Sequence, residues 1–229
     1  MVRKTKEDTE HTYSLLLDAA ESIFSQKGVA ASTLNDIATE AGMTRGAIYW
    51  HFKDKGALVR AMCDRATLPM EAMANEVMAA AGDDPLGSLR KLTVHALKQT
   101  AESARQHTVF DILFHKCEKT GELATVFNRE EECRNECHTR MQGLFDDAVK
   151  QGQLPADTDT KLAMQALHSY MVGLMHEWLL NPTAYDLAKR AETLVETMIA
   201  GLRFAPPRRV LRKPASVPKA KVHRQVVLT

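Results

Sequence analysis

Apolar residues recur every three or four positions along most of this chain, which is the spacing that places them on one face of a helix. In residues 12–27 the recurring positions include Leu16, Ala20 and Phe24, and the pattern stops at Gly28. No segment alternates apolar and polar residues over several positions, as a half-buried strand would. The chain is therefore predicted to be all-α.

Glycine, proline and capping residues divide this pattern into about nine helices. Thr33 and Asp54 each precede an apolar segment, and their side-chain oxygens can accept a hydrogen bond from an amide of the first turn. Gly42 can adopt the positive φ that a tight turn between two helices requires. The expected helices are residues 12–27, 33–41, a short helix from Thr44, 54–81, 85–105, 107–117, 122–151, 159–180 and 184–203.

The two short helices on either side of Gly42 have the pattern of a helix-turn-helix. Ala38 is small, as two closely crossing helices require, and three apolar residues are placed to fill the angle between them: Ile37, Met43 and Ile48. In this motif the second helix enters the major groove of DNA. Residues 1–53 are therefore expected to form a three-helix DNA-binding domain.

The side chains of the second short helix suit contact with DNA. Thr44 and the amides that follow it can bind a phosphate oxygen, and Arg45 can pair with guanine O6 and N7 or with a phosphate. Alternatively, the aromatic residues after Ala47 form only the core of a small helical bundle. We expect this role for Phe52 alone, because the three polar-tipped residues Tyr49, Trp50 and His51 cannot all face inward. The residues expected to contact DNA are Thr33, Thr44, Arg45, Gly46, Ala47, Tyr49, Trp50, His51 and Lys55.

Composition excludes several classes of protein. About 45% of the residues are apolar and 26% are charged, which is ordinary for a globular chain and not for a disordered one. No apolar run approaches the roughly 18 residues of a membrane span, and the N-terminus lacks the apolar segment of a signal peptide. The four cysteines are too few and too irregularly spaced for a secreted disulfide scaffold, so a cytoplasmic location is expected.

Residues 205–229 differ from the rest of the chain. They hold seven basic residues, no acidic residue and four of the eight prolines. So little apolar material cannot offset the entropy of ordering, and the segment is predicted to be a disordered basic tail. Nonspecific attraction to phosphate is its simplest function, and a solvated extension is the alternative. The remaining chain is acidic overall, so net charge alone does not indicate DNA binding.

The N-terminal segment 28–58 resembles the DNA-binding domain of TetR-family transcriptional regulators. The resemblance rests on Gly28, Thr33, Ile37-Ala38, Ala41-Gly42, Thr44-Arg45-Gly46, Ile48-Tyr49-Trp50-His51-Phe52, Lys55 and Leu58. The stretches 114–118 and 173–182 are further similar to the AcrR/TtgR branch, whose members repress multidrug efflux operons. The resemblance implies nine helices, a homodimer on palindromic operator DNA, and a small hydrophobic inducer bound within residues 54–204.

The C-terminal half is rich in methionine and phenylalanine, which suit a pocket that accepts ligands of varied shape. Composition alone favours a plain helical core, and it is the resemblance that implies a pocket beside the long helix 54–81. The candidate pocket residues are Leu92, Ala96, Phe110, Phe114, Cys137, Met141, His168, Val172 and Met175. The cavity is expected to be largely apolar, with His168 as one of its few polar groups.

Apolar stripes on the last two expected helices indicate a dimer contact. Paired with the same surface of a second copy, they would form a four-helix bundle and place two reading helices about 34–36 Å apart. The stripes are Leu167, Tyr170, Met171, Leu174 and Trp178, followed by Leu187, Ala191, Leu194, Met198 and Leu202.

A metal- or redox-sensing repressor is the main alternative function. Cys133 and Cys137 are four residues apart on one helix face, where two thiolates can bind a soft metal. Both also fall on the apolar stripe of that helix, where a free cysteine packs as a small hydrophobic residue. No phosphate loop, nucleophile elbow or catalytic carboxylate pair is recognisable, so neither an enzyme nor a cofactor is expected.

Overall fold

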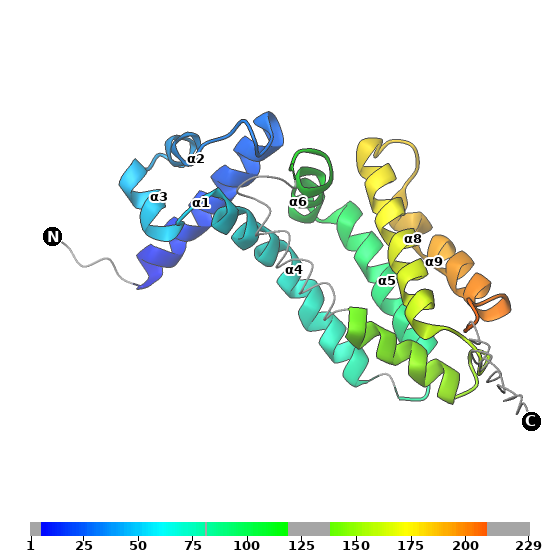
Figure 1. Cartoon of the computed structure of the whole chain (residues 1–229). Helices are drawn as coiled ribbons and strands as arrows, with labels where there is room; N and C mark the ends of the chain where they lie inside the picture. Colours follow the sequence, from blue (N-terminus) through cyan, green and yellow to red (C-terminus); the bar gives the residue numbers. More distant parts are fainter. Residues whose placement is uncertain (1–5, 81, 119–137, 210–229) are drawn as a thin grey trace, which may run out of the picture.

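The computed structural model describes residues 6–80, 82–118 and 138–209, and it confirms the all-α prediction (Figure 1). These ranges contain nine helices. One comprises residues 138–150. The others are α1 (Lys6–Lys27), α2 (Leu34–Glu40), α3 (Arg45–His51), α4 (Lys55–Ala79), α5 (Pro85–Glu102), α6 (Ala104–His115), α8 (Thr160–Leu180) and α9 (Leu187–Phe204). Within the same residues, the β structure is limited to one isolated antiparallel bridge between Thr158 and Arg208.

Capping residues fix the helix boundaries, as the sequence predicts. The Thr33 side chain accepts from the amide of Asp36 at the start of α2, and the Asp54 side chain accepts from Ala57 at the start of α4. α1 begins at Lys6, well before the predicted start at residue 12. The prediction missed this first part of the helix because its residues are polar and show no apolar face. The part of the expected helix 122–151 that precedes residue 138 lies outside the described residues.

Two hydrophobic cores organise the molecule. The first unites α1, α2, α3 and the first half of α4, and its fully buried side chains include Phe24, Ile37 and Ile48. The second joins the rest of α4 to α5, the helix at 138–150, α8 and α9. Figure 1 shows α4 running from the first unit along the second. The α6 helix contributes to both cores, through Ile112 to the first and Phe110 to the second.

Most of the apolar stripes predicted to form a dimer face the chain's own second core. Periodicity identifies the apolar face of a helix but does not say what covers it. The stripe residues buried within the single chain are Leu167, Met171, Trp178, Leu187, Ala191 and Leu202. Assigning these residues to a dimer contact is therefore wrong.

The start of the predicted disordered tail is ordered. The Asp159 amide donates to Pro207 O at 2.8 Å, and the Arg209 amide donates to Asp157 O at 2.9 Å. Pro206 is buried, and Arg208 forms a salt bridge with Asp157. Disorder is thus the wrong prediction for residues 205–209, because backbone pairing with the loop before α8 orders them. Among the described helices, none is long and apolar enough to cross a membrane.

Candidate nucleic-acid interface and ligand cavity

The α3 helix is held by its apolar side and by the turn before it. Ile48 is fully buried, and Phe52, at the C-cap, is buried as predicted. Gly42 has a φ of 67°, and the next amide, Met43 N, donates to Ala38 O at 2.8 Å. Because the turn and the buried face fix α3 in place, its opposite face is presented to the outside.

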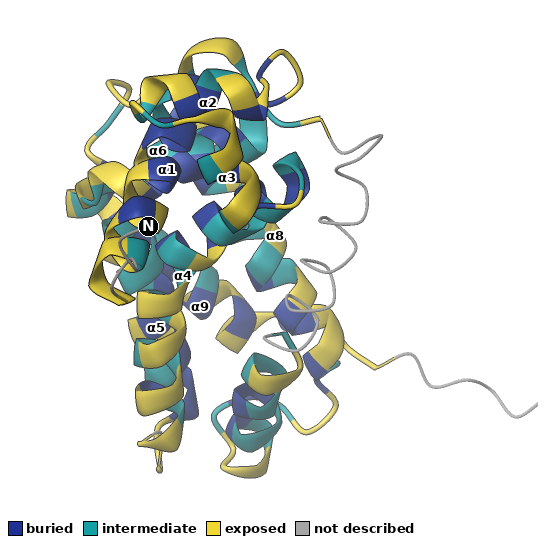
Figure 2. Ribbon diagram, turned by 90° about the vertical axis from the view of Figure 1, so that its left-hand side faces the viewer, coloured by how far each residue is buried: buried dark blue, intermediate teal, exposed yellow. Residues whose placement is uncertain are grey.

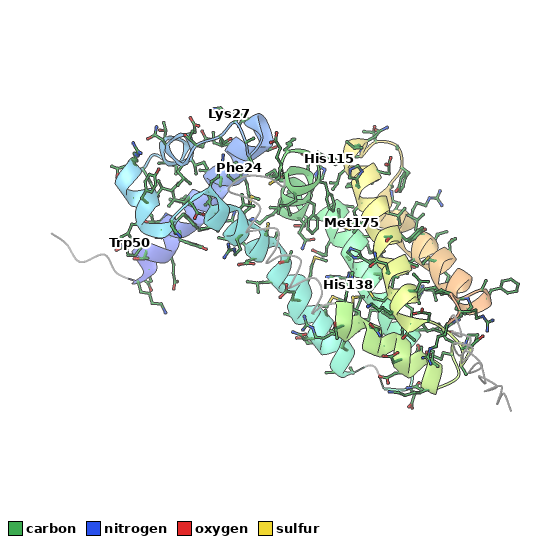
Figure 3. The ribbon with its side chains drawn as sticks, in the orientation of Figure 1. Phe24, Lys27, Trp50, His115, His138 and Met175 are labelled. Carbon is green, nitrogen blue, oxygen red and sulfur yellow. The ribbon has the colours of Figure 1, made fainter. Side chains whose placement is uncertain are left out.

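The outer face of α3 carries exposed side chains of the kind predicted. Trp50 is 71% exposed and Tyr49 is 47% exposed. The Arg45 guanidinium lies over the Tyr49 ring, 5.4 Å from its centroid. Thr44 caps the helix, and its hydroxyl accepts from the Ala47 amide at 3.3 Å. The outward sides of α2 and α3 are exposed (Figure 2), and Trp50 lies at the end of the molecule opposite α9 (Figure 3).

Three of the predicted DNA-contact residues also have structural roles within the chain. The Thr33 hydroxyl takes part in a capping box with Asp36. The His51 ring is half-buried and packs edge-on against the Trp50 ring at 4.6 Å. Lys55 Nζ donates to Ala30 O at 3.3 Å and to Ser32 O at 3.0 Å, which ties α4 to the turn after α1. Contact between these residues and DNA stays a prediction.

Tyr13 on α1 supports α3 in a way that the sequence analysis missed. Its ring stacks on Phe52 at 5.1 Å and lies 5.9 Å from the His51 ring. Burial and the nearby charge of Asp64 raise the pKa of Tyr13 above its ordinary value. No local sequence signal connects residue 13 to residue 52, because the contact depends on how α1 crosses α3.

Four charged side chains join α1 to α4 and α6. Arg65 Nη1 lies 2.9 Å from Asp18 Oδ1, and Arg65 Nη2 pairs with Glu21. Arg105 Nη2 lies 3.1 Å from the same Asp18 oxygen. The network holds α1 against both helices that lead into the second core. It was also missed, since its members are far apart in the sequence.

A cavity of about 550 Å³ lies between α4, α5, α6, the helix at 138–150 and α8. Eight of the nine predicted pocket residues line it, and the ninth, Cys137, lies outside the described residues. Figure 3 labels two lining residues, His138 and Met175. The eight are Leu92, Ala96, Phe110, Phe114, Met141, His168, Val172 and Met175.

The cavity wall is largely apolar, as expected, but α4 adds polar groups that were not predicted. Arg60, Asp64 and Glu71 line it from that helix. On the opposite side, the His138 and His168 rings meet at 4.2 Å. The expectation of few polar groups is therefore wrong on the α4 side. The sequence could not show this, because charged residues spaced along a long helix usually lie on its solvent-exposed face.

The α6 helix connects the cavity to the first core. Phe110 and Phe114 line the cavity, whereas Ile112 packs in the first core. At the end of α6, Lys116 O accepts from the Val29 amide at 2.9 Å, and Lys116 Nζ donates to Ser25 O on α1 at 2.9 Å. A ligand that displaces α6 would therefore also shift the turn between α1 and α2, through the hydrogen bonds of Lys116.

Asp111 holds the charged groups at the end of α6 together. Its carboxylate accepts from His115 Nδ1 at 2.9 Å and lies 2.7 Å from Lys116 Nζ. Burial acts to raise the pKa of Asp111, but the hydrogen bonds from Lys116 and His115 outweigh it and hold the pKa below its ordinary value. The carboxylate therefore stays charged and keeps Lys116 in position near neutral pH.

The structure does not test the predicted metal or redox pair. Cys133 and Cys137 lie outside the described residues. Within the part of the chain that the structure describes, no group of three or more His, Cys, Asp or Glu side chains is arranged to hold a metal ion.

An anchored helix-turn-helix with an exposed second helix, joined to a helical domain with a cavity, defines a DNA-binding transcriptional regulator. Two family descriptions match the chain: "Bacterial regulatory proteins, tetR family" over residues 16–62, and "MAATS-type transcriptional repressor, C-terminal region" over residues 84–204. The chain belongs to the TetR family of transcriptional regulators.

Similar proteins span nearly the whole chain. The HTH-type transcriptional regulator TtgR of Pseudomonas putida is 38% identical over 206 residues, which cover 90% of this chain and 98% of TtgR. The HTH-type transcriptional regulator AcrR of Shigella flexneri is 36% identical over 216 residues, covering 94% and 99%. The crystal structure of NalD, the secondary repressor of the MexAB-OprM multidrug efflux pump in Pseudomonas aeruginosa, has a TM-score of 0.78 at 34% identity, covering 86% and 98%.

Proposed function

We propose that this chain is a homodimeric repressor that binds a palindromic operator, controls a multidrug efflux operon and is released by small hydrophobic compounds. The observation that carries the proposal is the exposed face of α3, connected through α6 to a largely apolar cavity. The similarity to NalD, a repressor of an efflux pump, supports the choice of target. Binding of triclosan to SmeT, with a TM-score of 0.74 and 27% identity over 88% of this chain and all of that one, supports a hydrophobic ligand.

The dimer contact of the proposal lies on the outward faces of α8 and α9. Leu162 and Leu180 on α8 are 50% and 58% exposed, and Gly173 between them is also exposed. On α9, Leu194 and Met198 are half-buried. Exposed apolar side chains on α8, with half-buried ones on α9, suit an interface in which the same patch meets its copy across a two-fold axis.

Release follows from a difference in ligand affinity between two conformations. A ligand that fits the cavity better when α6 is displaced stabilises that arrangement, and only this difference can drive the change. Because Lys116 binds the turn after α1, a displaced α6 moves the DNA-binding domain. In a dimer such movement changes the separation of the two α3 helices, so they no longer match half-sites one helical turn apart.

Filling the cavity tests ligand release directly. The Ala96→Phe substitution places a phenyl ring in the cavity, where it competes with a ligand for space. We therefore expect release of operator DNA to require about tenfold more triclosan than in the wild type. The measurement is fluorescence anisotropy of a labelled operator duplex, enriched from a random pool with this protein, during triclosan titration. Ala104→Phe is the matched control, since Ala104 is exposed at the start of α6. Equal triclosan requirements for the two variants, or no release from the wild type, would contradict ligand-controlled repression.

Lys55→Ala is expected to change both stability and DNA binding. Two backbone carbonyls lose their donor, so the free energy of unfolding should fall by about 1 kcal/mol. If Lys55 also contacts a phosphate, the slope of log affinity against log salt should fall by about 1. Lys53→Ala is the matched control for stability, because Lys53 is exposed. A salt slope equal to that of the wild type would leave Lys55 with the structural role alone.

A further inference from the structure

Arg60 brings a positive charge to the end of the cavity that borders the DNA-binding domain. It follows Val59, which is fully buried in the first core, and it lines the cavity together with Cys63 and Thr67. Its Nε is buried and has no hydrogen-bond partner among the described residues. A buried N–H group without an acceptor carries an uncompensated desolvation cost, which a bound acceptor would remove.

Two acidic residues, Asp64 and Glu71, line the same cavity as Arg60 but form no described salt bridge with it. Asp64, one turn further along α4, has the spacing for an ion pair with Arg60, but no salt bridge joins Arg60 to a described carboxylate. The Asp64 side chain is exposed, and its charge acts on Tyr13 of α1. Arg65 on the same helix also has a buried Nε without a described partner, but both of its terminal nitrogens reach carboxylates of α1.

Apolar side chains from α4, α6 and α8 line the cavity together with Arg60. Leu113 and Phe114 of α6 line the cavity with it, and Met70 and Met175 continue the apolar wall. Electrostatic attraction is stronger where apolar groups exclude water. A volume of about 550 Å³ is ample for a molecule of two or three rings.

We propose that Arg60 is a ligand-recognition residue and that the cavity takes amphiphilic anions, in which an apolar body carries one oxyanion head such as a carboxylate, sulfonate or phenolate. The body lies along the methionine and phenylalanine side chains, and the head accepts hydrogen bonds from the Arg60 guanidinium. The inference rests on the proposed function only in taking the cavity as a ligand site.

Two fluorescent dyes that differ by the anionic head test this inference. Anilinonaphthalene sulfonate carries the sulfonate, and phenylnaphthylamine is the same ring system without it. Each dye is titrated into the wild-type chain, Arg60→Gln and Arg60→Lys. Arg90→Gln is the matched control, because Arg90 pairs with Glu196 away from the cavity and its loss changes the net charge equally. Melting temperatures verify that each variant is folded.

Arg60→Gln is expected to weaken sulfonate binding by about tenfold or more, with neutral-dye binding unchanged within about twofold. Arg60→Lys, which keeps the charge but not the planar fork, should retain part of the sulfonate affinity. Arg90→Gln should bind both dyes as the wild type does. An unchanged ratio of sulfonate to neutral-dye affinity in Arg60→Gln, or failure of the wild type to bind the sulfonate, overturns the inference.

The operator assay separates this inference from the proposed function. If the neutral dye releases operator DNA while the sulfonate ratio is insensitive to Arg60, ligand-controlled repression stands and the anion preference is wrong. If the sulfonate depends on Arg60 but neither dye nor triclosan releases operator DNA, the anion site stands and ligand-controlled repression is wrong.

Discussion

Replacing Arg65 by methionine is expected to lower the free energy of unfolding by about 3 kcal/mol. The Arg65 side chain is 17% exposed, and its two terminal nitrogens bind Asp18 and Glu21 on α1. Without it, Glu21, whose side chain is 12% exposed, has Arg105 as its one remaining described ion-pair partner, with Nε 3.6 Å away. A buried carboxylate that loses its main partner is left with an uncompensated desolvation cost. Urea unfolding at neutral pH, followed by far-ultraviolet circular dichroism, measures the loss.

Arg105→Met is the matched control for that measurement. Arg105 reaches the same two carboxylates, but its side chain is 46% exposed. Exposed ion pairs contribute little in water, so the expected loss is less than about 1 kcal/mol. Equal losses in the two variants would show that Arg65 is not the main partner of Glu21. They would also weaken the view that this network holds the DNA-binding domain to α4.

Arg45→Ala is expected to weaken operator binding by about 1–3 kcal/mol and to change the affinity for scrambled DNA much less. Arg45 is exposed in the first turn of α3, and its stacking on Tyr49 limits the directions that the guanidinium can take. A guanidinium in this position can make the paired contact with guanine O6 and N7 on which the expectation depends. Anisotropy titrations with both duplexes at one salt concentration measure the two affinities.

Lys53→Ala is the control for the loss of one positive charge near α3. If Arg45→Ala weakens both duplexes equally, as the loss of a phosphate contact would, Arg45 does not read a base. Stability is not expected to change in either variant, since both side chains are exposed.

The features that the sequence predicts correctly are local ones. The N-cap of Thr33, the positive φ of Gly42 and the burial of Phe52 all depend on neighbouring residues. These determine the shape and orientation of α3, so the face offered to DNA follows from a short stretch of chain. The lining of the cavity was named instead from resemblance to a family, because composition alone favours a plain core.

The features that were missed depend on contacts between distant segments. Arg65 and Glu21 look like ordinary solvated charges until α1 is packed against α4. Arg60 likewise looks like part of a polar face, yet its Nε is buried at the cavity. The buried residues of α8 and α9 show the opposite error, because an apolar stripe has the same periodicity whether the chain or a second copy covers it.

Enrichment of duplexes from a random pool by the purified full chain is the most direct test of the central claim, that two α3 helices read DNA together. The predicted result is an inverted repeat whose half-site centres are about 10 base pairs, or a multiple of that, apart, and Arg45→Ala should lose preference at a symmetric pair of positions. Recovery of no common sequence, or of a single half-site bound by one chain, would contradict the account.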